Sequence, residues 1–199
     1  MSMEGVLAAV VLLGLAQSGE RPPEPESPVV KAFADVCIAA KADHTRASTL
    51  AEGLGWSPAD PTTFFPEGAW QRDAEAHTRR IDDVMLTLII GDSPATDDGP
   101  AMAQCIIYAD PMVPGGALLP DPIYDLSHWI GMFPFPQLTT DAYDAYLFTV
   151  EDDGSLKSLA DRSELVAMQA YLNGRAHVIV AGMDGQQSAQ LAYTVPRSR

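Results

Sequence analysis

The sequence of 199 residues predicts an α+β fold, with N-terminal helices packed on a mostly antiparallel sheet. Near the N-terminus, apolar residues recur at three- and four-residue spacing, which is typical of helices that bury one face. Later segments are short, rich in β-branched residues and separated by turn formers, as antiparallel strands are. The length corresponds to one ordinary domain, and the sequence contains no internal repeat.

Two helices are expected first. One begins at Pro28 with Ser27 as its N-cap, because proline fits the first helical position, where an N–H is not needed. A second spans residues 43–54, capped by its first aspartate, and Gly55 stands where a left-handed C-terminal residue belongs. Trp56 is expected to fold back against this helix. The apolar stripe of the first helix comprises Val29, Val30, Phe33, Val36, Cys37 and Ala40.

The middle of the chain gives a weaker signal. Residues 69–80 are expected to form a third short helix or an irregular segment. Residues 84–90 and 103–108 are short and apolar, and the turn formers between them predict a hairpin with a long loop.

The last third of the chain predicts two more hairpins and one helix. Residues 142–150 form a strand that turns at Asp153-Gly154 into residues 155–159. Ser163 caps a helix through Leu172, which Asn173-Gly174 closes. The segments 177–181 and 190–195 alternate around Asp184-Gly185, which indicates a further hairpin.

Charge excludes one class of function. The chain has 12 basic and 27 acidic residues, a formal net charge of −15 and a pI near 4.4. Such a protein does not bind nucleic acid by neutralising phosphates, and docking on an anionic membrane is disfavoured. No run of eighteen apolar residues is present, so no stable membrane span is expected.

Residues 1–18 are predicted to be a signal peptide. Residues 6–16 are apolar and too short to anchor the chain, and small residues follow at signal-peptidase spacing. Glu4 stands where a basic residue is usual, and a buried N-terminal helix is the alternative. Residues 19–27 are a leader rich in proline and glutamate, and residues 28–199 are the α+β domain. The composition is rich in alanine and contains more arginine than lysine, which suggests a GC-rich bacterium. Together with the signal peptide, this predicts a periplasmic or secreted bacterial protein.

Cys37 and Cys105 are the only cysteines. One lies on the buried stripe of the first helix and the other in the second strand of the first hairpin. In an exported protein an even number of cysteines favours a disulfide. Two buried free thiols and a redox-active pair are the alternatives, although no Cys-x-x-Cys motif is present.

No catalytic residue, metal site or cofactor is predicted. The four histidines never occur three or four residues apart, and no Gly-x-Ser-x-Gly or glycine-rich phosphate loop is present. A weak calcium site at residues 92–99 and solvated turn acids are the two interpretations of the acidic clusters.

Residues 111–140 form an unusually long connection with six prolines and four aromatic residues. These aromatics form either a lid over the sheet or a binding surface for a peptide, glycan or protein. A disordered segment or a substrate loop is the third interpretation. The candidate binding residues are Tyr124, Trp129, Phe133 and Phe135.

The pattern is similar to that of small secreted proteins of unknown function from GC-rich bacteria. The resemblance spans residues 29–110 and depends on Val36-Cys37 in a helix, Gly55-Trp56 at a helix end and Cys105 in a strand. It implies an envelope domain with a helix–strand disulfide, and it brings no activity and no catalytic residues.

The sequence therefore predicts a noncatalytic envelope protein that binds an unknown protein or small ligand through residues 111–140. One alternative is an envelope hydrolase built around His77 or His128 with a nearby carboxylate. Another is an acidic inhibitor or immunity-like protein that meets a basic partner.

Overall fold

The computed structural model describes residues 24–64, 72–95, 100–118, 120–151, 156–183 and 187–197. The predicted signal peptide, most of the leader and the turns at 153–154 and 184–185 lie outside the described residues. The helical elements are α1 (Pro28–Phe33), the π-helix η1 (Ala34–Ile38), α2 (His44–Gly53), the 3-10 helix η2 (Pro61–Thr63), α3 (Pro122–Ile130) and α4 (Glu164–Leu172). The strands are β1 (Ser57–Ala59), β2 (Arg72–Ile81), β3 (Val84–Ser93), β4 (Met102–Pro111), β5 (Tyr143–Val150), β6 (Leu156–Ser158), β7 (Ala176–Met183) and β8 (Ala189–Pro196).

The described strands form one sheet in the order β1-β2-β3-β4-β8-β7-β5-β6, and every neighbouring pair is antiparallel. The α+β class is therefore confirmed, and so are the three predicted hairpins. The helices are not all N-terminal, because α3 and α4 follow β4 and β6 in the chain.

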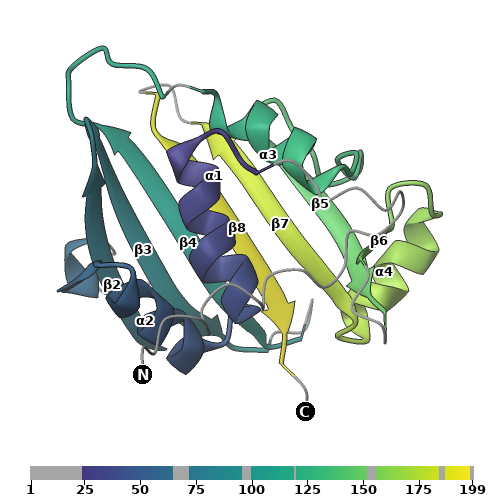
Figure 1. Cartoon of the computed structure of the whole chain (residues 1–199). Coiled ribbons are helices and arrows are strands. Elements are labelled where there is room, and N and C mark those ends of the chain that lie inside the picture. The colour runs from purple at the N-terminus through teal and green to yellow at the C-terminus, as the bar shows by residue number, and fades with distance from the viewer. Residues whose placement is uncertain are drawn as a thin grey trace, which may run out of the picture.

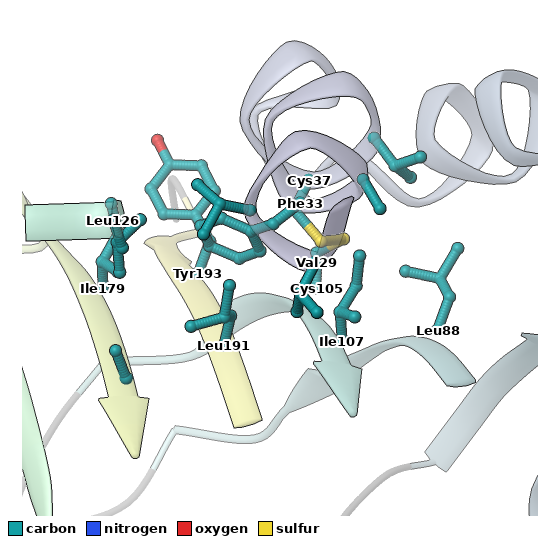
Figure 2. Packing of buried hydrophobic residues seen from close by; sticks show 14 of the residues in the cluster. Val29, Phe33, Cys37, Leu88, Cys105, Ile107, Leu126, Ile179, Leu191 and Tyr193 are labelled. Atoms are coloured by element: carbon teal, nitrogen blue, oxygen red, sulfur yellow. A yellow bond between two sulfur atoms is a disulfide. The ribbon is translucent and has the colours of Figure 1, made fainter. Parts of the chain in front are cut away.

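The main core lies between α1, η1, α2, α3 and one face of the sheet. In Figure 1 the first helix crosses in front of β4 and β8. Val29, Phe33 and Cys37 point from it toward Ile107 and Leu191 on the sheet (Figure 2). Because the predicted stripe of the first helix is buried along its whole length, the expected helix face is confirmed.

The predicted caps form as expected at both N-terminal helices. The Oγ atom of Ser27 accepts a hydrogen bond from the Val29 N–H at 3.3 Å, and Oδ1 of Asp43 accepts one from the Arg46 N–H at 2.9 Å. Gly55 follows the C-terminal end of α2 with a φ of 81°, a left-handed conformation that glycine adopts readily. Trp56 then folds back and is buried.

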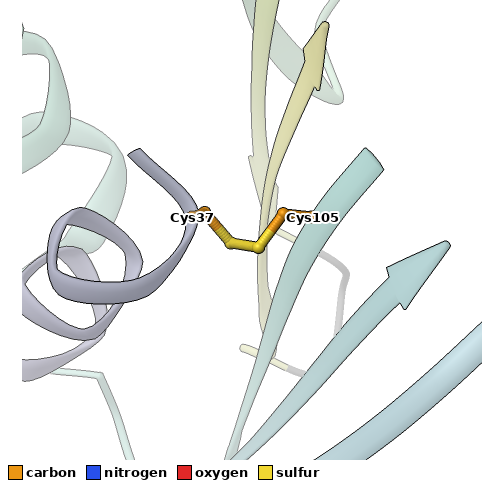
Figure 3. The surroundings of a disulfide bond; sticks show 2 residues. All are labelled: Cys37 and Cys105. Carbon is orange, nitrogen blue, oxygen red and sulfur yellow. A yellow bond between two sulfur atoms is a disulfide. The ribbon is translucent and has the colours of Figure 1, made fainter. Parts of the chain in front are cut away.

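A disulfide joins Cys37 on η1 to Cys105 on β4, across a sequence separation of 68 residues (Figure 3). Both residues are fully buried in the main core. The predicted disulfide is therefore present, and it fastens the first helical unit to the centre of the sheet.

The expectation of a helix or irregular segment at residues 69–80 is wrong for the residues that the structure describes. Residues 72–81 form β2, which pairs along β3 with Ala76 opposite Ile89. Glu75 and His77 lie on the opposite face of the strand, toward α2. The residue that this strand buries is a small alanine rather than a β-branched residue. The alternation of apolar and polar residues that marks a strand is therefore difficult to recognise in the sequence.

The expectation of one long irregular connection at 111–140 is also corrected, because the segment contains α3. Asp121 caps this helix by accepting hydrogen bonds from the N–H groups of Ile123 and Tyr124 at 2.8 and 3.2 Å. Pro122 occupies the first turn and Gly131 closes the helix with a φ of 61°. Across the described part of the chain, no helix combines the length and apolar character needed to cross a membrane.

Candidate functional site

The face of the sheet opposite the main core carries a groove beside α4, which lies at the β5–β6 end of the sheet (Figure 1). We call it the α4 groove. It is bounded by α4, by residues 135–138 and by side chains of β4, β5, β7 and β8, with Ser93, Pro94 and Pro100 at its rim. Its volume is about 650 Å³, within the range typical of small-molecule sites.

A row of side chains across four strands forms the floor of the groove. Gln104 of β4 is paired with Thr194 of β8, which is paired with Val178 of β7, which in turn is paired with Leu147 of β5. Residues opposite one another in paired strands project to the same face. Side chains from four segments that are distant in the sequence therefore meet in one line. Met102, the first residue of β4, extends the apolar floor.

The wall formed by α4 presents two helix faces. Ala167 and Ala170 are buried against a cluster that includes Leu147 and Val178. Since alanine is small, it lets the helix axis lie close to the sheet. Met168 and Tyr171 line the groove from the neighbouring face, together with Glu164 at the first turn.

The outer side of α4 is also apolar. Leu165, Val166, Met168 and Leu172 are exposed by 68%, 47%, 45% and 51%. Exposed apolar patches of this kind are more common at surfaces that bind ligands or partners than elsewhere on a protein. The all-round apolar composition of residues 164–172 is also the signal by which the sequence could have pointed to this site.

Residues 135–139 form the opposite wall because they are hydrogen-bonded to β5. The N–H of Phe135 donates to the carbonyl of Ala145 at 2.6 Å, and the N–H of Ala145 donates to Oγ1 of Thr139 at 3.2 Å. Phe135 is only 3% exposed, and Leu138 reaches the groove from the next turn. The wall is thus fixed by backbone contacts rather than by packing alone.

The lining of the α4 groove combines apolar side chains with a few polar groups. It is predominantly apolar, with polar groups from Gln104, Gln137 and Thr194. The hydroxyl of Thr194 is engaged with the carbonyl of Val178 at 3.3 Å. Apolar walls with a small number of fixed polar groups are characteristic of sites that hold ligands.

The four predicted binding aromatics do not form one surface. Phe135 lines the α4 groove, and Trp129 packs against the main core on the other face of the sheet. Tyr124 is 73% exposed on α3 and stacks on His128, with ring centroids 6.5 Å apart. Phe133 is 81% exposed in the segment that follows α3.

A second hollow of about 570 Å³ lies at the other end of the predicted binding segment. It is bounded by residues 110–116 and by Gln187 and Ser188. Gly116 is required there, because a Cβ atom at this position would lie 2.8 Å from the carbonyl oxygen of Val113. Turn residues form most of this hollow, and Asp110 is the only charged residue among those described that line it.

His77 meets a serine and a carboxylate, but not in the arrangement of a hydrolase. Its Nε2 atom lies 3.4 Å from Oγ of Ser48 and 3.8 Å from Oε2 of Glu75. A catalytic triad places the carboxylate on the opposite ring nitrogen, where it orients the base. The Nδ1 atom of His77 is instead buried and has no hydrogen-bond partner among the residues that the structure describes. His44 faces the same carboxylate, with its Nε2 atom 3.7 Å from Oε1.

His177 is placed in the main core rather than in the groove. Its Nδ1 atom lies 2.9 Å from the hydroxyl of Tyr193, and its ring stacks on those of Phe148 and Tyr193. Burial, with a further contribution from the charge of Lys41, lowers the pKa of His177 to about 4. Burial raises the pKa of Tyr193 as well. Both groups are therefore neutral at neutral pH, which suits a structural role.

Over the ranges that the structure describes, no group of three or more histidine, cysteine or acidic residues is placed to hold a metal ion. In the candidate calcium segment 92–99, the carboxylate of Asp92 is paired with the guanidinium of Arg197, whose Nε donates to it at 3.1 Å. Residues 96–99 of that segment lie outside the described ones.

Comparisons with known proteins give no relative for this chain. No protein-family model, no curated protein and no solved structure matches it.

Proposed function

We propose that this protein is a noncatalytic binding protein, exported to the envelope of a bacterium, that holds a small apolar ligand in the α4 groove. The observation that carries the proposal is the groove itself, which is about 650 Å³ in volume and mainly apolar in lining. Sites of this size and character bury most of the surface of a small organic molecule.

The exposed apolar side chains of α4 support the same conclusion. Met168 both lines the groove and is 45% exposed, so the apolar lining of the groove continues to the protein surface. An apolar ligand that enters from the surface meets apolar contacts along its route.

Export is supported by two features. The Cys37–Cys105 disulfide is of a kind that persists in oxidising compartments. Residues 6–16 have the length and apolar composition of the core of a signal peptide.

A neutral, environment-sensitive dye such as Nile red tests the proposal. The dye should bind to the protein and gain fluorescence. Met168→Glu should weaken binding by tenfold or more, because it places a charge against the ligand inside an apolar site. Leu165→Glu is the matched control, since Leu165 is on the same helix but does not line the groove.

Thermal unfolding of both variants establishes that α4 still folds. If Nile red does not bind to the folded wild-type protein, or if Met168→Glu binds it as well as Leu165→Glu does, the proposal is wrong. Binding that is lost in both variants alike places the site on the outer side of α4 instead, and likewise contradicts it.

A further inference from the structure

The α4 groove carries little charge of its own. Among the described residues that line it, Glu164 is the only charged one. Its side chain lies at the first turn of α4 and is exposed, so its carboxylate stands at the mouth of the groove rather than at the apolar floor.

Glu164 forms no ion pair or hydrogen bond with any residue that the structure describes. Two arginines flank α4, Arg162 before it and Arg175 after it, but neither lines the groove. Within the described part of the chain, the mouth of the groove therefore offers a negative group without a counter-ion.

We infer that the ligand of the α4 groove is an amphiphile with a cationic headgroup, whose apolar chain lies between α4 and residues 135–138 while its positive group faces Glu164. This inference rests on the proposed function. It specifies the chemical class of ligand that the apolar groove alone leaves open.

The net charge of the whole protein also favours a cationic ligand over an anionic one. A formal net charge of −15 produces a negative potential that concentrates cations and repels anions. A fatty acid or a phosphorylated lipid would bring a second negative charge next to Glu164, with no basic side chain in the described lining to neutralise it. An ammonium or guanidinium headgroup is the charged headgroup that complements the site.

Three probes with the same ten-carbon chain and different headgroups distinguish the contribution of the headgroup to binding from that of the chain. Decyltrimethylammonium, decanol and decanoate are each titrated against bound Nile red at low ionic strength, below their critical micelle concentrations. An exposed ion pair supports roughly fivefold discrimination, so the ammonium should displace the dye about fivefold more tightly than decanol. Decanoate should bind more weakly than decanol, because like charges repel. The preference for the ammonium should fall as salt is added.

Glu164→Gln should remove the preference for the ammonium over decanol and leave the affinity for decanol unchanged. Asp161→Asn is the matched control, because Asp161 is an exposed acid close to α4 that does not line the groove. This variant should keep the preference.

The outcomes distinguish the inference from the proposed function. If Nile red binds and the three probes displace it equally, or decanoate binds most tightly, the inference is wrong and the groove remains an apolar site. A preference that survives in Glu164→Gln also overturns the inference. If Nile red does not bind to the folded wild-type protein, the proposed function fails, and the inference fails with it.

Discussion

The backbone N–H of Ser27 donates a hydrogen bond of 2.9 Å to Oδ2 of Asp125, a residue 98 positions later in the chain. The other carboxylate oxygen accepts a hydrogen bond from the N–H of Glu26 at 3.2 Å. Asp125 is buried on α3, while Ser27 is the N-cap of α1. One carboxylate thus joins the start of the first helix to a helix that the sequence did not predict.

Replacing Asp125 with alanine should destabilise the protein by about 2–3 kcal/mol. One buried N–H group, that of Ser27, and one partly buried N–H group, that of Glu26, would lose a charged acceptor, and a buried donor left unsatisfied is costly. Urea unfolding measures the change, and Asp141→Ala, which removes an exposed acid, should stay within about 0.5 kcal/mol of wild type. Equal midpoints for the two variants would show that the Ser27–Asp125 contact does not stabilise the fold.

Removing the disulfide should lower the melting temperature. A cross-link that closes a loop of this length contributes about 4 kcal/mol through the entropy of the unfolded chain. For a protein of this size that corresponds to roughly 10 °C. Calorimetry of Cys37→Ala/Cys105→Ala should show the fall, and reductant should leave the variant unchanged. An unchanged melting temperature would mean that the bond adds nothing to stability.

Two glycine substitutions should act in opposite directions. A Cβ atom at Gly182 of β7 would lie 2.8 Å from the carbonyl oxygen of Ala142, so Gly182→Ala should destabilise the fold by about 1–3 kcal/mol. Gly53 at the end of α2 has open space around it, and Gly53→Ala should stabilise by about 0.5 kcal/mol. Chemical denaturation measures the stability of both variants. If Gly182→Ala is as stable as the wild-type protein, the close approach of the Ala142 carbonyl to this position is refuted.

His177 should make the protein less stable as the pH falls. Its pKa is about 4 when folded and about 6.5 in an unfolded chain, so the unfolded state takes up the proton first. The contribution of this group is complete above pH of about 6.5 and is lost as the pH falls toward 4. Unfolding at pH 7.5 and 5.0 should show a smaller difference for His177→Gln than for wild type. A midpoint near 6.5 in an NMR titration of the folded protein would contradict this.

The sequence predicts those elements whose local signals agree with their tertiary environment. Ser27, Asp43 and Gly55 mark helix ends by their own chemistry, and the structure places them at helix ends. The strands beginning at Val84 and Met102 are apolar on both faces because both are covered. Such signals can be recognised without knowledge of the fold.

Other elements depend on contacts that the sequence does not display. The strand β2 contributes Ala76 to a cluster with Ile89, and alanine carries no preference for strands. The cap of α3 at Asp121 follows several prolines, which suggested an irregular segment. Tertiary packing rather than local propensity decides the structure of β2, whereas α3 has local end signals at Asp121, Pro122 and Gly131 that the surrounding prolines obscured.

The α4 groove was not predictable because its floor depends on strand order. Gln104, Thr194, Val178 and Leu147 become neighbours only when β8 and β7 insert between β4 and β5. Of the predicted binding residues, Phe135 is the one that reaches this groove. The apolar character of α4 was visible in the sequence, but the surface that it faces was not.

Methionine methyl groups provide the most direct test of the α4 groove as the ligand site. Met102 and Met168 line the groove, whereas Met112, Met132 and Met183 lie elsewhere in the fold. In a methyl NMR spectrum of selectively labelled protein, decyltrimethylammonium should shift the signals of Met102 and Met168 in a saturable way and leave the other three in place. Saturable shifts at Met112, Met132 or Met183, with Met102 and Met168 unmoved, would contradict the account.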